Sequence, residues 1–191
     1  MLSLNLDRSA FYAPSAIGYS ISANQGGNMF TLDKVLKEDT YWLGDFPLCR
    51  LLLSKDANYP WFILVPRRSG VTEICDLSAT DQEKFMRESN FLSLLLRRLF
   101  AADKLNIAAL GNVVAQLHVH HIVRYKSDDA WPSPVWGYAP ATPYGEQRYS
   151  TLIGQLAALS ECPEFRFAQA PTGLRTLNYR ENRVFSPFID L

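Results

Sequence analysis

All three histidines of the chain, His118, His120 and His121, lie within the segment 116–124 (QLHVHHIVR). Its apolar residues predict a β-strand, in which successive side chains point to opposite faces. On such a strand His118 and His120 share one face with Gln116, about 6.5 to 7 Å apart along the backbone. Because the pKa of imidazole lies near neutrality, one ring can act as nucleophile or base while the other orients it or donates a hydrogen bond.

Two other interpretations of this cluster stay open at the level of sequence. The three residues can be ordinary histidines of a sheet. The pair His118 and His120 can also supply two ligands to a metal ion, but a catalytic metal needs a third protein ligand. The sequence has no histidine outside the cluster, and no acidic pair shows a recognisable ligand spacing. We therefore expect neither a metal nor another cofactor.

Apolar runs separated by turn residues predict the sheet that carries this strand. Residues 49–53 (CRLLL) and 61–65 (WFILV) flank a turn-rich gap around Asp56. Two apolar runs around such a gap predict antiparallel neighbouring strands. Further strands are expected at 105–110 and at the end of residues 29–43, after a short helix or turn.

Helical periodicity completes the expected fold. Thr80 and Glu83 have the spacing of a capping box, and apolar residues then recur at helical intervals to near Ala101. This pattern predicts a long amphipathic helix, and a second helical segment is expected at 146–159. The alternation of antiparallel hairpins with helices indicates an α+β fold.

The composition limits the classes of partner. Nineteen basic and nineteen acidic residues cancel, which argues against a general nucleic-acid binder and against attraction to an anionic membrane. The sequence has no run of about 18 apolar residues, so we do not expect a membrane span. Asp7 and Arg8 interrupt the apolar run that a signal peptide needs. Cys49, Cys75 and Cys162 fall outside any C-x-x-C motif, so we expect buried, reduced thiols of a cytoplasmic protein.

Residues 111–124 (GNVVAQLHVHHIVR) resemble the signature of the histidine triad (HIT) family, which runs Gly-Gln, three residues, His-x-His-x-His, two apolar residues and often Pro-Arg. Residues 61–68 (WFILVPRR) resemble the family's Gly-His-apolar-Val-Ile-Pro-Lys strand, and residues 73–78 are similar to the segment before its long helix. The likeness covers roughly residues 30–136. It implies a HIT-like antiparallel sheet packed against a long helix, and a homodimer.

The resemblance also suggests how the chain is divided. Residues 1–28, rich in Ser, Ala, Asn and Gly, are expected to form an N-terminal arm. Residues 29–139 would form the HIT-like catalytic domain, and residues 140–191 a C-terminal extension that packs on it. Within the domain, the Trp/Pro loop, residues 128–136 (DDAWPSPVW), would form a lid or wall of the site, or pack on the core or across a subunit boundary.

Two registers of the signature are possible. Aligning Arg124 with the family's arginine places Gln116, His118 and His120 at the first, second and third histidines. The other register starts the triad at His118 and places Ile122 third, where an apolar side chain cannot orient a nucleophile. We therefore use the first register, in which glutamine replaces the first histidine.

In this register the resemblance implies that His118 attacks the α-phosphate of a nucleotide derivative and forms a nucleotidyl-histidine, which water or another acceptor resolves. His120 would hydrogen-bond phosphate oxygens or the leaving group. Asn112, in the place of the family's Gln, and Asn106 would bind the phosphates. Gln116 would complete the catalytic set, since an amide can replace imidazole as donor or acceptor. The implied activity is that of a nucleotide hydrolase or nucleotidyl transferase that needs no metal.

Some positions depart from the family's pattern. Trp61 stands where many relatives have histidine, and Ser69 where another histidine often lies. Asp56 is the nearest match to the ribose-binding acidic residue, or alternatively a turn residue. His121 would face away from the site. A nucleotide-binding module with little or no turnover and a metal-dependent hydrolase remain alternative functions.

Overall fold

The computed structural model describes residues 30–168, which form a six-stranded antiparallel sheet and the helices that cover it. The strand order is β4-β5-β3-β2-β1-β6. The strands are β1 (Thr40–Asp45), β2 (Cys49–Ser54), β3 (Trp61–Pro66), β4 (Lys104–Ala108), β5 (Val119–Arg124) and β6 (Arg166–Phe167). The helices are α1 (Lys34–Asp39), α2 (Ala79–Phe100) and α3 (Glu146–Gln155), with short 3-10 helices η2 (Ile74–Asp76) and η3 (Leu156–Glu161). The predicted arm, residues 1–28, lies outside the described residues, as do residues 169–191.

The predicted α+β class and the predicted hairpin are confirmed. Strands β2 and β3 pair antiparallel, with Leu51 opposite Leu64. The histidine strand β5 lies between β3 and β4, with His120 opposite Ile63 on one side and Ala108 on the other. The strand is shorter than expected and begins at Val119, because the backbone N–H of Leu117 donates to Val71 in the loop after β3 instead of joining the ladder.

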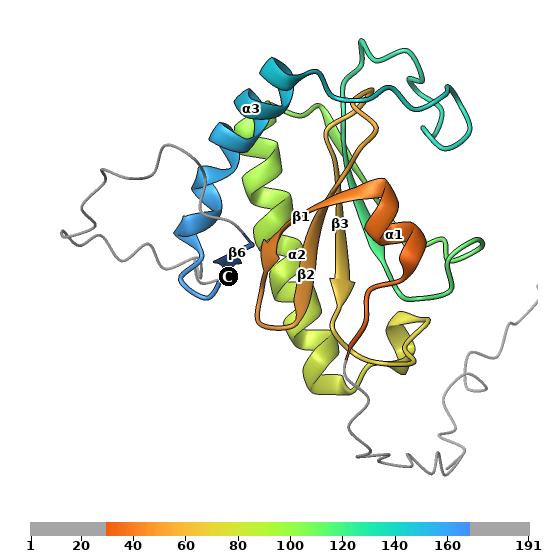
Figure 1. The fold of residues 1–191 in the computed structure, drawn as a ribbon, viewed down its shortest axis with the longest axis vertical. Coiled ribbons are helices and arrows are strands. Elements are labelled where there is room, and N and C mark those ends of the chain that lie inside the picture. Colours follow the sequence, from red (N-terminus) through yellow and green to blue (C-terminus); the bar gives the residue numbers. More distant parts are fainter. Residues whose placement is uncertain (1–29, 169–191) are drawn as a thin grey trace, which may run out of the picture.

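The sheet has two differently covered faces. One face packs on α2, α3 and η3, and in Figure 1 the strands lie between these helices on the left and α1 on the right. Leu36 of α1 covers Leu52, Ile63 and Val65 on the opposite face. The two faces therefore differ in the elements packed on them: a long helix buries one face, and a short helix and loops cover the other.

The long helix begins earlier than the sequence pattern predicts. Its N-cap is Ser78, whose hydroxyl accepts from the backbone N–H of Asp81, so the predicted capping box of Thr80 and Glu83 is wrong. The box fails because Ser78 already caps the helix two residues earlier, so Thr80 lies inside the first turn. The helix ends at Phe100, close to the predicted end near Ala101; Ala101 is the C-cap and adopts a left-handed conformation with φ of 46°.

All three cysteines are free, as expected for reduced thiols. Cys49 is buried and Cys162 is partly buried, but Cys75 is exposed, so the prediction of three buried thiols is wrong. Cys75 lies in η2, a single turn that buries none of its residues. None of the helices within residues 30–168 combines the length and apolar character needed to cross a bilayer.

Candidate active site

The histidine pair lies on the sheet face opposite α2. The rings of His118 and His120 meet edge to face with centroids 4.9 Å apart, which agrees with the predicted alternation along an extended chain. Both are largely buried, at 7% and 8% exposure. The two imidazoles are therefore close enough to interact and are shielded from water, unlike histidines on a solvated surface.

The ring of His118 has a defined proton position. Its Nδ1 lies 2.7 Å from the backbone carbonyl oxygen of Gln116. Because a carbonyl only accepts, Nδ1 must carry the hydrogen, and the lone pair of the neutral ring is therefore on Nε2. The backbone before the strand thus leaves Nε2 of His118 as the ring nitrogen that can accept a hydrogen bond.

The ring of His120 has the opposite tautomer. Its Nδ1 lies 2.9 Å from the indole nitrogen of Trp61, and indole N–H only donates. Nδ1 of His120 is therefore an acceptor, and the hydrogen of the neutral ring is on Nε2. Burial, followed by the nearby charges of His118 and His121, lowers the pKa of His120 to about 4, so this ring is neutral at pH 7.

An aromatic wall encloses His120. The ring of Trp136 lies 5.6 Å from that of His120 and 5.6 Å from that of Trp61, in edge-to-face contacts. Trp136 belongs to the Trp/Pro loop, so the structure places the end of this loop against the histidine pair. The loop both lines the histidine pair and packs on the core, the two placements that its sequence leaves open, since Val135 is buried against Ile122.

Arg124 holds the Trp/Pro loop on the sheet. Its buried guanidinium binds the Asp128 carboxylate through two hydrogen bonds of 2.8 and 2.9 Å, and also donates to the backbone carbonyl of Ser133. Its Nη1 donates to Oδ1 of Asn106 at 2.6 Å. The oxygen of the predicted phosphate ligand Asn106 is therefore engaged by Arg124, and only its amide N–H groups are left for a substrate.

Gln116 anchors the segment that leads into α1. Its side-chain oxygen accepts from the backbone N–H of Asp33 at 2.9 Å, and its NH₂ donates to the carbonyl of Thr31 at 2.9 Å. Asp33 is in turn the N-cap of α1. The sequence alone does not indicate this contact, because 83 to 85 residues separate the partners along the chain. One amide therefore supplies both a donor and an acceptor to the backbone of residues 31–33.

The remaining candidates are in loops. Asn112 is exposed, next to Gly111, whose positive φ of 70° turns the loop between β4 and β5. Asp56 lies in the β2–β3 turn, where its Oδ1 accepts from the backbone N–H groups of Asn58 and Thr142. Among the described residues these contacts hold Asp56 on the turn and on residues 140–143, and none of them joins it to the histidine pair.

His121 faces α2, as the alternation predicts. Its Nε2 lies 2.8 Å from the hydroxyl of Ser89, and its Nδ1 lies 3.2 Å from the carbonyl of Val119. The residue is fully buried, and this burial lowers its pKa to about 4. His121 therefore belongs to the core, and only His118 and His120 face the site.

The two low pKa values predict acid sensitivity of the fold. An unfolded chain binds a proton on each histidine below about pH 6.5, whereas native His120 and His121 bind one only near pH 4. The free energy of unfolding should therefore fall as the pH drops from 6.5 to 4, by about 2 kcal/mol per histidine at pH 5. Urea unfolding at pH 7 and 5 measures this loss. A His121→Gln variant should lose less stability between these pH values, and an unchanged pH dependence would show that His121 does not titrate as described.

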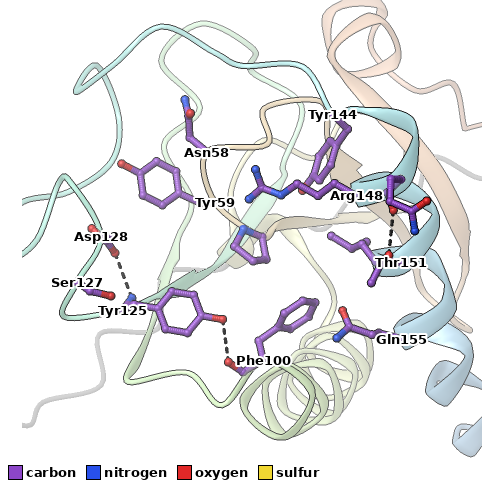
Figure 2. A pocket seen from close by; sticks show the side chains of 13 residues that line it. Asn58, Tyr59, Phe100, Tyr125, Ser127, Asp128, Tyr144, Arg148, Thr151 and Gln155 are labelled. Atoms are coloured by element: carbon purple, nitrogen blue, oxygen red, sulfur yellow. Dashed lines mark hydrogen bonds between the residues drawn. The ribbon is translucent and has the colours of Figure 1, made fainter.

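A separate cavity of about 700 Å³ opens between α3, the end of α2 and the turn before β3 (Figure 2). Its walls include Tyr59, Tyr125 and Tyr144, and the Tyr125 hydroxyl donates to the carbonyl of Phe100. Burial raises the pKa of Tyr144 to about 12, which makes it a poor acid or base at neutral pH. No histidine lines this cavity, so it is distinct from the histidine pair. Within residues 30–168 no three His, Cys, Asp or Glu side chains gather as a metal site.

Comparison with known proteins gives a consistent result. The sequence model of the HIT domain family matches residues 36–127. A histidine triad protein from Marinobacter aquaeolei VT8 is 49% identical, with a TM-score of 0.68 over 70% of this chain and 97% of that one. A histidine triad protein from Bradyrhizobium japonicum is 46% identical, with a TM-score of 0.66 over 68% and 96% of the two chains.

A histidine triad (HIT) protein from Sinorhizobium meliloti 1021 is 41% identical, with a TM-score of 0.65 over 67% of this chain and 95% of that one. The search of curated proteins found no match. The solved structures therefore align along nearly their whole length with about two thirds of this chain.

Proposed function

Because the chain belongs to the histidine triad family, we propose that it is a nucleotide hydrolase or nucleotidyl transferase that acts at the α-phosphate. The observation that carries the proposal is the short contact between Nδ1 of His118 and the Gln116 carbonyl. This contact leaves the lone pair of His118 on Nε2, on the face of the sheet that it shares with His120. A neutral imidazole with a fixed free nitrogen is a competent nucleophile near pH 7.

The proposed reaction has two displacements at phosphorus. Nε2 of His118 attacks, the P–N bond forms, and the P–O bond to the leaving group breaks with its electron pair on the leaving group. The ring becomes positively charged, and Nδ1–H donation to the Gln116 carbonyl stabilises this charge. Water or another acceptor then attacks phosphorus, the P–N bond breaks, neutral His118 is restored, and the acceptor's proton passes to solvent.

Other residues supply hydrogen bonds in this scheme. The Nε2–H of His120 would donate to a non-bridging phosphate oxygen or the leaving group, since its tautomer directs the hydrogen away from Trp61. Asn112 and the NH₂ of Asn106 are the proposed further phosphate ligands, and Asp56 the proposed ribose ligand. Gln116 would act as a positioning residue for the segment before α1, because the oxygen and the NH₂ of its amide are both bound to residues 31–33.

Hydrolysis in H₂¹⁸O of diadenosine triphosphate, a probe with two equivalent α-phosphates, tests the site of attack. The label should appear in AMP and not in ADP, because water attacks the adenylyl group held on the enzyme. Label in ADP would overturn attack at the α-phosphorus. Tight binding without any product would instead favour the nucleotide-binding module. Activity that disappears in excess chelator and returns with a metal would favour the metal-dependent hydrolase.

We further propose a cytoplasmic location, which the free thiols support because they suit a reducing compartment.

We also propose that the protein is a homodimer that forms along β4. Strand β4 is an edge of the sheet, and nearby Ile107, Leu110 and Val113 are 50%, 45% and 92% exposed. Unpaired backbone groups beside exposed apolar side chains favour pairing with a second copy. Light scattering should give twice the 21.6 kDa chain mass. Ile107→Lys should yield monomer and the control Leu94→Lys on α2 should not; a monomeric wild type would contradict the proposal.

A further inference from the structure

Trp61 is the residue at the site whose chemistry differs most from that of the histidine expected there. Its indole N–H donates to Nδ1 of His120 at 2.9 Å. A histidine in this place could donate or accept, and could change role with pH, whereas indole only donates. The indole N–H therefore keeps Nδ1 of His120 as a hydrogen-bond acceptor, because the indole itself cannot change from donor to acceptor.

This fixed role limits what His120 can do. To act as a strong proton donor, the ring must first become an imidazolium, which carries hydrogens on both nitrogens. A hydrogen on Nδ1 would point at the indole hydrogen, and the contact with Trp61 would be lost. Neutral imidazole keeps its Nε2–H but is a very weak acid. His120 can therefore donate a hydrogen bond, but cannot readily give up a proton.

Within residues 30–168, the groups around His120 do not favour a proton on Nδ1. Ile63 of β3 and Ala108 of β4 lie opposite it in the sheet, and Trp136 covers the ring from the loop. The titratable groups that act on it are His118 and His121, and both disfavour a positive charge. Among the described residues no carboxylate contributes to the shift of its pKa.

We propose that Trp61 is a specificity-determining residue, which restricts the site to nucleotide derivatives whose leaving group departs as a stable anion, such as a phosphate or polyphosphate chain. This inference rests on the proposed function and narrows its substrate class. A phosphate leaving group accepts the electron pair of the broken P–O bond without a proton. An amine leaving group needs a proton on nitrogen before the P–N bond to it breaks, and His120 cannot supply that proton.

Imidazole ¹⁵N NMR tests the structural half of the inference without any turnover. In the wild type at pH 7, His120 should show the Nε2–H tautomer, and Nδ1 of His118, which faces the Gln116 carbonyl, should carry a hydrogen. In Trp61→Phe, His120 should become a mixture of tautomers with a higher pKa. The matched control Trp136→Phe removes a neighbouring indole that does not bind Nδ1, and should leave the tautomer of His120 unchanged. An Nδ1–H tautomer of His120 in the wild type would overturn the inference.

Two probes with the same nucleoside test the functional half. Because a general acid contributes roughly 100-fold or more, kcat/KM for diadenosine triphosphate should exceed that for adenosine 5′-phosphoramidate by at least about 10-fold at pH 7. Trp61→His should reduce this ratio by about 10-fold or more, chiefly by raising kcat for the phosphoramidate. The inference about Trp61 would be overturned by a wild type that prefers the phosphoramidate, or by a ratio that Trp61→His leaves unchanged. Either result would leave the proposed function standing. Absence of turnover with both probes would overturn the proposed function, while the NMR result would still decide the role of Trp61.

Discussion

Replacing His118 with glycine should lower kcat by roughly 1,000-fold or more, because the variant has no nucleophile to form the covalent intermediate. The dissociation constant for AMP should change little, since the aromatic wall and the phosphate ligands stay in place. Steady-state kinetics with diadenosine triphosphate and calorimetric titration with AMP measure the two effects separately. Such a split assigns His118 to bond formation and not to binding.

Free imidazole gives this prediction a direct control. Added to His118→Gly, imidazole can occupy the vacated space and attack phosphorus, so it should restore part of the turnover and release adenosine 5′-phosphorimidazolide. His121→Gln is the matched control, because His121 faces α2 and its loss should leave kcat within about threefold. Turnover by His118→Gly close to that of the wild type would show that another group carries the reaction.

Replacing Arg124 with methionine should reduce the free energy of unfolding by about 3–5 kcal/mol, the second large effect that the structure predicts. Methionine retains apolar volume but removes the hydrogen bonds to Asp128, Asn106 and Ser133. Asp128, whose hydrogen bonds with Arg124 hold its pKa below the usual range, would remain as an uncompensated, poorly exposed carboxylate. Urea unfolding at pH 7 measures the loss.

Two further variants separate charge from geometry. Arg124→Lys keeps the positive charge but loses the planar fork, so it should recover only part of the stability. Adding Asp128→Asn to Arg124→Met removes the unpaired carboxylate, and should make the double variant more stable than Arg124→Met. A cost below about 1 kcal/mol for Arg124→Met would mean that this buried ion pair does not hold the Trp/Pro loop in place.

Local sequence patterns were sufficient to predict most of the fold. The hairpin of β2 and β3, the length of α2 and the orientation of His121 away from His118 all follow from periodicity within short windows. Two details at the ends of elements were wrong, the start of β5 and the N-cap of α2. The Ser78 cap and the hydrogen bond from Leu117 to Val71 decide these two ends, and spacing alone does not reveal them.

The site was predictable only in part, because its supporting contacts join distant segments. The histidine pair was visible as a cluster in four residues. By contrast, Trp61 binds His120 across 59 residues, and the amide of Gln116 binds residues 31–33 across more than 80. Trp61 gave one usable signal, since it stands where the resembling family has histidine. No sequence signal indicated the hydrogen bond from Arg124 to Asn106, because it depends on the register of β4 against β5.

Trapping the covalent intermediate tests the central claim most directly. Wild-type protein mixed with diadenosine triphosphate for milliseconds, quenched at alkaline pH and digested with trypsin, should yield the peptide of residues 105–124 carrying one adenylyl group on His118. The same peptide from His118→Gly should be unmodified. If the wild type releases AMP while this peptide stays unmodified at every time point, or carries the group on His120, nucleophilic attack by His118 is refuted.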